Sequence, residues 1–480
     1  MRFIADLHIH SKYARAVSPR MTLPELDRWA HDKGIKVMGT GDFTHPEWFA
    51  LLEQQLEPAE AGLYRLKEKY KLPTIRGSRA ETRFLLTSEV ANVYTRAGKG
   101  RRVHMLLFAP DLETVKKINM AIAAKGCNIK SDGRPIIGMD VQELCRIVWD
   151  INPEVAVVPA HIWTPWFAIF GSKSGFNSIE ECFGKYSDRI FAMETGLSSD
   201  PAMNWRWREL DTIALISNSD SHSLERIGRE ANMFDTDLSY AGIMKALKKA
   251  SQDSVIASTR SNPGSSNDLD RHASTLAMTE SARFVATIEY FPEEGMYHYD
   301  GHRKCSVSYD PVATRKHRGI CKECGKPVTV GVLNRLDKLA DRSEGEVKKE
   351  IGSVEIGEVT GQQFRNRPPF VNLVTLDTII AEALGVGTAS KRVKAQYDVM
   401  LRAFGSELDI LMNLPLSQLL TTHYKLPPSV SEGIRRMRAG EFKITPGFDG
   451  QYGEVHLFDA KEKKELKIGV SRAAQTLFDS

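Results

Sequence analysis

Seven short apolar runs in the first half of the chain constrain its fold more than any other feature of the sequence. All are rich in β-branched residues, and we expect each to form a strand: 2–7, 35–40, 84–89, 103–108, 155–159, 190–194 and 213–217. Apolar residues with helical spacing lie between several of these runs, at 111–124 and 141–149. Thr22-Leu23-Pro24 has residue types that commonly begin a helix. Strands that alternate with helices predict an α/β fold, with the strands in a parallel barrel or sheet.

Each predicted strand carries a potential metal ligand near one end. After the first strand, His8 and His10 are two residues apart, so both side chains should point to the same side. The other candidates follow later strands or, in one case, begin one: Asp42, His45, Glu89, His104, His161, Glu194, Asp220 and His222. One such residue alone is usually a helix cap or a solvated loop residue. A whole series of them predicts a site at the carboxyl ends of the strands, where the active sites of α/β barrels lie.

His104 is the exception in this series, because it begins its predicted strand. The connection from Val90 to Arg102 is short and contains two glycines, which favours a hairpin over a helical crossover. In an antiparallel pair, Glu89 and His104 would meet at the same end of the sheet.

The chemistry of this series indicates more than one divalent ion. Imidazole nitrogen combined with carboxylate oxygen suits zinc, manganese or iron. Clustered divalent ions suit the hydrolysis of a phosphate ester, because they lower the pKa of a bound water and neutralise the leaving oxygen.

The order of these residues resembles the motif series of the polymerase and histidinol phosphatase (PHP) superfamily. The resemblance covers about the first half of the chain and implies a distorted seven-stranded (βα) barrel that hydrolyses phosphoesters. It implies that one set of residues binds metal: His8, His10, Glu89, His104, His161, Asp220 and His222. The superfamily more often has adjacent Asp and His where this chain has Asp42 and His45, so these two are open as ligands. Glu194 is either a ligand or a structural carboxylate, and Asp6 is a candidate for orienting a histidine.

A second group of potential ligands follows the polar, turn-rich stretch 251–281, which we interpret as a linker or surface insertion. A Cys-x-x-Cys-Gly sequence at 321–325 resembles a zinc knuckle, in which backbone amides face the thiolates. A matching His-x-x-Cys completes the predicted ligand set: His302, Cys305, Cys321 and Cys324. His298 and His317 are possible substitutes, and a redox pair or unliganded thiols are the rival interpretations. A redox motif would require a βαβ setting, so we expect one structural zinc ion.

Basic residues are concentrated around and after this knuckle. A solvated basic face is the default interpretation, but next to a phosphoesterase a surface that follows a nucleic-acid backbone explains them equally well. The last part of the chain is predicted to be mainly helical, with helices at 373–384, 390–404 and 408–420. Aromatic residues and glycines at 442–453 could stack on a base. The side chains expected to contact DNA are Lys12, Arg15, Arg101, Arg102, Arg303, Arg435, Arg436 and Arg438.

The order of these parts, together with residues 300–305 and 321–332, is similar to the endonuclease Q family. This resemblance implies a DNA repair endonuclease that cuts 5′ to a deaminated base (hypoxanthine, uracil or xanthine) or an abasic site. It implies two or three divalent ions in the barrel (Zn, Mn or Mg), damaged DNA as partner and a flipped-out base. The family is also similar to PHP modules associated with superfamily-one DNA helicases, which implies a link to replication or helicase machinery.

Two other functions are alternatives. A PHP-type phosphatase acting on a small phosphomonoester would share the barrel chemistry, but it has no need of a zinc knuckle or a basic helical domain. A non-catalytic DNA-binding helicase accessory module would be expected to lack metal ligands, whereas the series in this chain is intact.

We expect five parts along the 480 residues: a PHP-like catalytic barrel at 1–250, a linker or insertion at 251–281, a zinc-binding domain at 282–345, a helical DNA-binding domain at 346–455 and a charged tail at 456–480. Asp6 interrupts the N-terminus before the apolar segment of a signal peptide forms. No apolar run approaches the roughly 18 residues of a membrane span. We therefore expect a cytoplasmic protein with no membrane partner. The net charge of +4 neither requires nor excludes nucleic acid.

Overall fold

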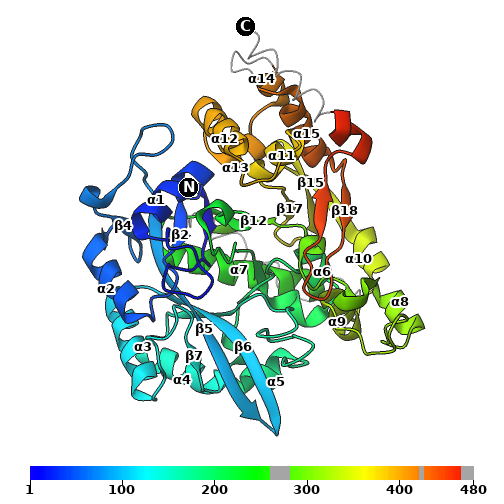
Figure 1. The fold of residues 1–480 in the computed structure, drawn as a ribbon. Helices are drawn as coiled ribbons and strands as arrows, with labels where there is room; N and C mark the ends of the chain where they lie inside the picture. The colour runs from blue at the N-terminus through cyan, green and yellow to red at the C-terminus, as the bar shows by residue number, and fades with distance from the viewer. Residues whose placement is uncertain (260–281, 421–425, 466–480) are drawn as a thin grey trace, which may run out of the picture.

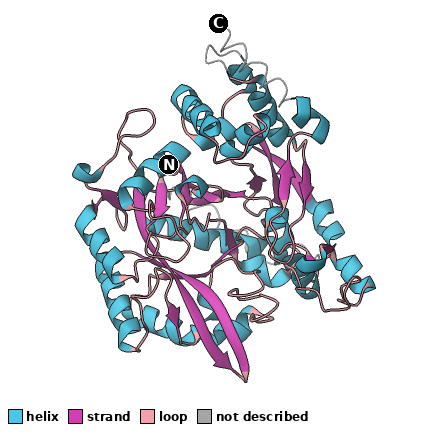
Figure 2. Ribbon diagram, in the orientation of Figure 1, coloured by secondary structure: helices cyan, strands magenta, loops and turns pink. Residues whose placement is uncertain are grey.

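The computed structural model describes residues 1–259, 282–420 and 426–465 (Figure 1). It is a mixed α/β structure in which helices surround one large sheet (Figure 2). The strands of this sheet in the described ranges are β1 (Arg2–Asp6), β2 (Val37–Gly39), β3 (Leu56–Pro58), β4 (Tyr64–Leu66), β5 (Arg83–Arg96), β6 (Lys99–Ala109), β7 (Ile136–Ile137), β8 (Ala156–Pro159), β11 (Ala231–Asp235), β12 (Arg283–Glu289), β15 (Ile351–Ile356), β16 (Val359–Phe364) and β17 (Phe370–Asn372). The main path runs in the order β15-β16-β17-β12-β11-β1-β2-β5-β4-β3, and β6, β7 and β8 branch from it.

Three two-stranded sheets accompany the large one: β9 (Ala192–Glu194) with β10 (Ala214–Ile216), β13 (Asp300–His302) with β14 (Val307–Tyr309), and β18 (Lys443–Thr445) with β19 (Glu454–His456). The helices of the first part are α1 (Leu23–Lys33), α2 (Pro46–Gln55), α3 (Leu112–Ala124), α4 (Val141–Ile151), α5 (Ile179–Phe183), α6 (Pro201–Asn204) and α7 (Tyr240–Thr259). Those that follow are α8 (Pro311–Lys316), α9 (Val332–Leu339), α10 (Glu344–Glu350), α11 (Leu376–Ala383), α12 (Lys391–Phe404), α13 (Glu407–Met412), α14 (Leu416–Leu420) and α15 (Pro428–Ala439). Among the helices of the described ranges, we find none with the length and apolar character that a bilayer span requires.

All seven predicted strands are present, as β1, β2, β5, β6, β8, β9 and β10. β1, β2 and β5 are parallel neighbours, whereas β5 and β6 form the antiparallel hairpin that the short connection predicted. This hairpin projects well beyond the rest of the sheet in Figure 1. β9 and β10 pair only with each other, so closure into a seven-stranded barrel stays a prediction.

Local sequence explains where the covering helices begin and end. The Asp111 carboxylate accepts the Thr114 N–H at the start of α3, and Asp140 caps α4 in the same way. α1 ends at Gly34, whose φ of 95° lies in the left-handed region that favours glycine. Each helix therefore has a defined length before its apolar face packs against the sheet.

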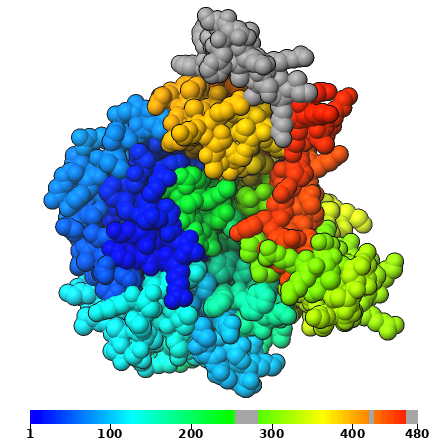
Figure 3. All heavy atoms as spheres, in the orientation of Figure 1, coloured from blue at the N-terminus to red at the C-terminus, as the bar shows by residue number. Residues whose placement is uncertain are grey.

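The C-terminal helices share one hydrophobic core with the large sheet, since Leu26 of α1 and Leu411 of α13 belong to the same cluster. A buried ion pair crosses this contact, with Lys33 Nζ 2.5 Å from Glu407 Oε2. The Tyr397 hydroxyl donates to the same carboxylate oxygen. The helical part is thus packed against the N-terminal part. Figure 3 shows these two parts and the 290–340 region together on the visible face of the molecule.

Three sequence-based expectations need correction. The predicted linker at 251–281 begins too early, because α7 continues to Thr259; residues 260–281 lie outside the described ranges. The helix expected at 408–420 is two helices, since Pro415 interrupts it between α13 and α14. The predicted zinc-binding domain at 282–345 contains β12, and the predicted helical domain at 346–455 contains β15 to β17, but all four strands belong to the large sheet. The domain boundaries themselves stay a prediction, and residues 466–480 of the expected tail lie outside the described ranges.

Candidate metal centre

His8 and His10 lie just beyond β1, where the chain runs beside the loop that carries Asp220. Ile9 forms a parallel bridge with Ser221, and the His10 N–H donates to the Ser221 carbonyl. Both histidines are buried, and their ring centroids are 5.3 Å apart. The alternation of strand side chains therefore places the two rings together, as the His-x-His spacing predicted.

A buried carboxylate fixes each of these rings. His8 Nδ1 lies 3.0 Å from Glu194 Oε1, and His10 Nδ1 lies 2.9 Å from Asp42 Oδ1. With Nδ1–H donating to the carboxylate, each Nε2 presents a lone pair. Neither Nε2 has a hydrogen-bond partner among the described residues, although both atoms are buried. Buried polar atoms normally have a partner, and a metal ion would supply one for these two nitrogens.

Asp220 completes the first donor group. Its Oδ1 lies 3.6 Å from His8 Nε2 and 3.2 Å from His10 Nε2. This oxygen is also buried without a hydrogen-bond partner in the described part of the chain. Asp220 has a φ of 44°, in the left-handed region, which costs energy for a residue other than glycine and is typical of functional sites.

The β5–β6 hairpin and the loop after β8 supply the second donor group. Glu89 Oε1 lies 2.6 Å from His104 Nδ1 and 3.1 Å from His161 Nε2. Glu89 and His104 meet because their strands are antiparallel, as expected. The other oxygen, Oε2, lies 3.2 Å from His10 Nε2 and 3.6 Å from His8 Nε2. Glu89 therefore lies between the two donor groups, with one oxygen toward each.

Both carboxylates of the centre are charged. Burial alone would raise the pKa of Glu89, but His104 and the neighbouring cationic groups outweigh burial and hold this pKa well below its usual range. Burial would also raise the pKa of Asp220, but His8 and His10 outweigh burial and hold this pKa well below its ordinary value. Burial lowers the pKa of His104 to about 4, although the Glu89 carboxylate acts to raise it.

These donor groups fit divalent metal ions. Imidazole nitrogens and carboxylate oxygens are ligands of zinc, manganese and iron, and each group of three places its donor atoms within 4.8 Å of one another. Burial would lower the pKa of His8 and of His10, but the carboxylates around them raise both pKa values well above the usual range. The surroundings of the two rings thus favour positive charge.

The remaining predicted ligands lie around these groups. His222 has its ring centroid 4.7 Å from that of His10, and its Nδ1 lies 2.9 Å from the Asp220 carbonyl oxygen. Asp42 and Glu194 contact the Nδ1 atoms of the histidines and belong to neither donor group. These contacts suit side chains that orient the two histidines.

Two expectations differ from the structure. His45 belongs to neither donor group; its Nε2 lies 3.3 Å from the Lys130 carbonyl oxygen and its ring stacks on Tyr13. Asp6 does not orient a histidine. Its carboxylate accepts the N–H groups of Ser219 and Gly228, so it holds the loop that carries Asp220.

Two residues of the centre were not singled out from the sequence. Arg134 Nη1 lies 3.2 Å from Glu89 Oε2, and Asn218 Nδ2 donates to Glu194 Oε1 over 2.9 Å. Arg134 belongs to no motif, and no regular spacing of residues in its loop indicates a site. Asn218 directly precedes the Ser219-Asp220 pair at a strand end, which was a usable signal.

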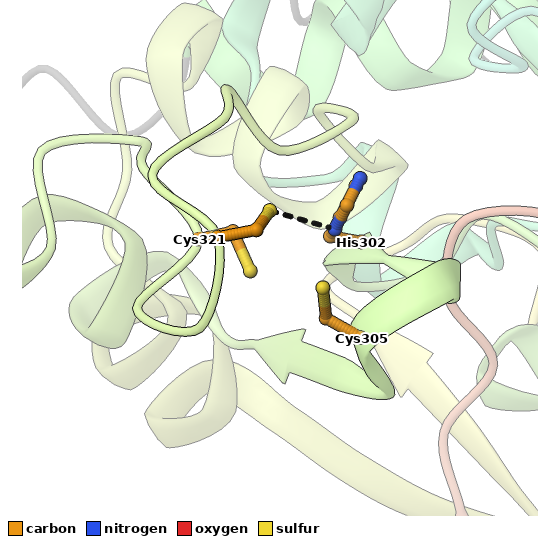
Figure 4. A group of neighbouring side chains, drawn as sticks. His302, Cys305 and Cys321 are labelled. Atoms are coloured by element: carbon orange, nitrogen blue, oxygen red, sulfur yellow. Dashed lines mark hydrogen bonds between the residues drawn. The ribbon is translucent and has the colours of Figure 1, made fainter.

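The second candidate metal site lies around β13 and β14, in a small lobe at residues 299–331 that we call the zinc lobe. The structure brings the donor atoms of the four predicted ligands within 4.8 Å of one another: His302, Cys305, Cys321 and Cys324. Three of them point toward a common centre in Figure 4, and His302 Nδ1 lies 3.4 Å from Cys324 Sγ. Gly325 closes the turn with a φ of 70° and donates its N–H to the Cys321 carbonyl. Three thiolates and one imidazole fit a structural zinc ion.

The possible substitutes for His302 lie outside this group. His298 is buried, and burial lowers its pKa to about 4. The His317 ring stacks on Tyr309 with centroids 4.8 Å apart. The buried core of the lobe is small, consisting of Val307, Tyr309, Cys321 and Val328.

Four of the arginines expected to contact DNA are engaged by the protein itself. Arg101 and Arg438 are buried, and their guanidinium groups donate to main-chain carbonyl oxygens. Arg435 and Arg436 each lie 2.8 Å from a carboxylate oxygen of Glu432. Contacts within the protein therefore occupy part of the donors of these four arginines, and their contact with DNA stays a prediction. The others are exposed: Lys12, Arg15, Arg102 and Arg303.

A cavity of about 460 Å³ opens beside the second donor group. It joins metal donors to aromatic side chains from distant parts of the sequence: His104, His161, Trp166, Asp220, Tyr297 and Tyr452. Tyr452 is 71% exposed and Trp166 is 36% exposed. The cavity therefore offers flat apolar surface directly next to the metal donors.

Comparison with solved structures identifies the fold. The crystal structure of the lesion-specific endonuclease PfuEndoQ from Pyrococcus furiosus aligns with a TM-score of 0.73 and 29% identity, covering 95% of each chain. Endonuclease Q in complex with a 27-mer duplex that has an abasic lesion at the active site aligns with a TM-score of 0.75 and 28% identity, covering 97% of this chain and 98% of that one. The resemblance to endonuclease Q is confirmed. It extends over the large sheet, the zinc lobe and the C-terminal helices alike.

Sequence comparisons find relatives of unknown function. Residues 375–441 match the family described as MJ0043 C-terminal domain. Uncharacterized protein MJ0043 of Methanocaldococcus jannaschii is 28% identical over 295 residues, which are 61% of this chain but only 31% of that protein. Uncharacterized protein YqxK of Bacillus subtilis is 26% identical over 465 residues, 95% of this chain and 99% of that one.

Proposed function

We propose that this chain is a metal-dependent DNA repair endonuclease that hydrolyses the phosphodiester 5′ to a deaminated base or an abasic site. The observation that carries the proposal is the position of Glu89 between two histidine-containing donor groups, beside an aromatic cavity. The endonuclease Q complex with a duplex bearing an abasic lesion supports the class of substrate.

Two divalent ions (zinc, manganese or magnesium) suit the centre, one for each donor group, and His222 is the candidate ligand for a third. Bound there, such ions would lower the pKa of a water nucleophile and neutralise the leaving oxygen. Glu89 would serve both groups, because each of its oxygens faces a different one.

The protein's own part in the reaction is to fix these ligands before substrate arrives. Glu194 holds the Nδ1 side of His8, and Asp42 holds that of His10, so each ring has one orientation and one tautomer. Asn218 in turn donates to Glu194. A preorganised centre of this kind spends no binding energy on rearranging its ligands during the reaction.

The cavity beside the centre is the candidate site for a displaced base. A stacked base hides the edge that distinguishes hypoxanthine, uracil or xanthine from an ordinary base, so the enzyme must rotate it out of the duplex. Trp166, Tyr297 and Tyr452 supply the apolar faces on which a base stacks. Exposed basic side chains of the zinc lobe, such as Arg303, are candidates for contacts with the DNA backbone.

The experiment that tests this proposal uses duplexes labelled at one end, each carrying a single inosine, uracil, xanthine or abasic site, with Mn²⁺ or Mg²⁺. We expect one nick, 5′ to the lesion, and none in the matched undamaged duplex. Asp220→Ala should remove the nick but leave DNA binding, whereas His31→Ala, in the last turn of α1 and outside both donor groups, should not affect cleavage.

The same assay separates the alternatives. Turnover of small phosphomonoesters with no nick in any duplex would favour a phosphatase. Binding to DNA without cleavage under every divalent ion would favour a non-catalytic module. The cytoplasmic location and the link to helicase machinery stay predictions; both are compatible with an enzyme that acts on cellular DNA.

A further inference from the structure

Arg134 contacts the carboxylate that the two donor groups share. Its Nη1 lies 3.2 Å from Glu89 Oε2, the oxygen that also lies 3.2 Å from His10 Nε2. The Arg134 side chain is 23% exposed, so the guanidinium extends from the buried centre to solvent. Among the residues that the structure describes, Glu89 is the one hydrogen-bond acceptor of this guanidinium. Most of its five N–H donors therefore remain available.

The loop that carries Arg134 is fixed by the scaffold of the metal centre. The Gly133 N–H donates to the Tyr13 carbonyl, and the Thr44 hydroxyl donates to the Gly133 carbonyl. A Cβ on Gly133 would lie 2.3 Å from Asp42 Oδ2, so only glycine allows this approach. Asp42 is the residue that orients His10. The position of Arg134 is thus set by the same contacts that set the ligands.

Charge balance indicates what Arg134 does when ions are bound. The donor groups contain two carboxylates, Glu89 and Asp220, with a total charge of −2. Two divalent ions would bring +4, and both the ions and Arg134 would compete for Glu89 Oε2. With an ion on Glu89 Oε2, the guanidinium loses the one hydrogen-bond acceptor that it has among the described residues, whereas a phosphate supplies new acceptor oxygens. The planar guanidinium fork matches two phosphate oxygens at once.

A second arginine near the centre, Arg229, makes a different contact. Arg229 lines the cavity, but its Nε donates to the Ser219 carbonyl over 3.0 Å. Arg134 instead contacts a carboxylate of the donor groups directly.

We propose that Arg134 is a phosphate-binding residue of this centre, which pairs with Glu89 in the metal-free protein and with the scissile phosphate once ions are bound. The inference rests on the proposed function, because it needs ions in the donor groups and a phosphodiester substrate. It assigns a second task to the residue, since Arg134 also keeps the two buried carboxylates from repelling each other before ions bind.

Two titrations of the full-length protein test this. In the first, Mn²⁺ is added to metal-depleted protein in a calorimeter; in the second, inorganic phosphate is added to the Mn²⁺-loaded protein. For Arg134→Gln we expect Mn²⁺ affinity equal to or higher than in the wild type, because a competitor for Glu89 is gone. We expect phosphate affinity at least about tenfold lower, since a charge-assisted bidentate contact is lost. Arg134→Lys should lie between the two in phosphate affinity, because it keeps the charge but not the fork.

A matched control removes one positive charge elsewhere. Arg146→Gln on α4 loses an exposed ion pair with Asp150 and should change neither affinity. Thermal melting of each variant checks folding, and Arg134→Lys provides the test if Arg134→Gln does not fold.

Lower phosphate affinity together with unchanged or higher Mn²⁺ affinity in Arg134→Gln would support the inference. Unchanged phosphate affinity in Arg134→Gln would overturn it, and so would weaker Mn²⁺ binding, which would mean that Arg134 only supports the ligands. The proposed function has a separate readout: if the wild type nicks damaged duplexes while phosphate affinity does not change, only the assignment of Arg134 is lost. If the wild type nicks no duplex, the proposed function fails whatever the two affinities are.

Discussion

The metal centre and the zinc lobe both bring together histidine with anionic ligands, but they assemble them over very different lengths of chain. The donors of the metal centre extend from His8 to Asp220, whereas those of the zinc lobe extend only from His302 to Cys324. The metal centre is surrounded by the main hydrophobic core, and its ligands are oriented by further buried groups such as Glu194. The zinc lobe has only a few buried side chains of its own.

This difference indicates which site depends on its ion for structure. Long-range strand pairing and buried carboxylates hold the metal centre in place, so its geometry should survive without ions. A lobe with so small a core cannot offset the entropy of folding by burial alone, and the ion supplies the missing free energy. Removing a ligand should therefore damage chemistry at one site and structure at the other.

The largest expected effect is at the metal centre. Asp220→Ala should lower the rate of nicking at least about a thousandfold, because metal ions supply several kcal/mol of transition-state stabilisation. Its melting temperature should stay close to that of the wild type. Single-turnover rates on an inosine duplex and a thermal melt measure the two effects, with His31→Ala as control. A variant that still nicks within tenfold of the wild-type rate would contradict the assignment of Asp220.

The zinc lobe should respond in the opposite way. Cys321→Ser removes the most buried ligand of the lobe, and we expect the loss of one bound zinc ion with fast amide hydrogen exchange confined to residues 299–331. Affinity for duplex DNA should fall roughly ten- to a hundredfold at moderate salt, because several basic side chains lose fixed positions together.

Mn²⁺ binding at the metal centre should be unchanged in Cys321→Ser. Metal analysis, hydrogen exchange and a Mn²⁺ titration measure these three quantities on one preparation. Slow exchange retained throughout the lobe would show that the ion does not hold it together.

A residue that only orients a ligand should give a smaller effect. Glu194→Gln keeps the size of the side chain but replaces the charged acceptor of His8 Nδ1. Substitution of such partners typically lowers metal affinity roughly ten- to a hundredfold, and we expect that range for Mn²⁺. If Glu194 were itself a ligand, activity would not be restored by excess Mn²⁺; if it orients His8, saturating Mn²⁺ should restore most of the rate.

The comparison also explains which features could be predicted from sequence. The seven strands and the donor set were accessible because apolar runs mark strands and because the end of each run carried His, Asp or Glu. The group of four candidate zinc ligands could be predicted because these residues lie within one short stretch at fixed spacing. In both cases the signal is local. In the metal centre, the parallel or antiparallel direction of neighbouring strands then determines which strand ends meet.

The features that sequence could not provide depend on contacts between distant segments. Arg134 reaches Glu89 only because Gly133 packs against Asp42, and no spacing announces that contact. Arg101 and Arg438 are predicted DNA contacts because charge is visible in a sequence, whereas their burial against main-chain carbonyl groups is not. Asp42 and Glu194 were recognised as part of the site, but their task of orienting histidines is a matter of geometry.

The smallest expected effect concerns the buried acids beneath the metal centre. Glu289 on β12 is fully buried, with the Thr287 and Thr195 hydroxyls donating to its two oxygens, and burial raises its pKa from 4.5 to about 8. Folding therefore favours the protonated form. The stability that this group contributes is complete below pH 4.5 and is lost as the pH rises through about 8. Glu289→Gln remains neutral at every pH, so its melting temperature should exceed that of the wild type by a few degrees at pH 9 and match it at pH 4.5 or below. Glu113→Gln, an exposed change on α3, should show no such pH dependence. If the melting temperatures of Glu289→Gln and the wild type differ by the same amount at both pH values, Glu289 does not titrate between them. The buried Glu289 carboxylate would then be charged at both pH values.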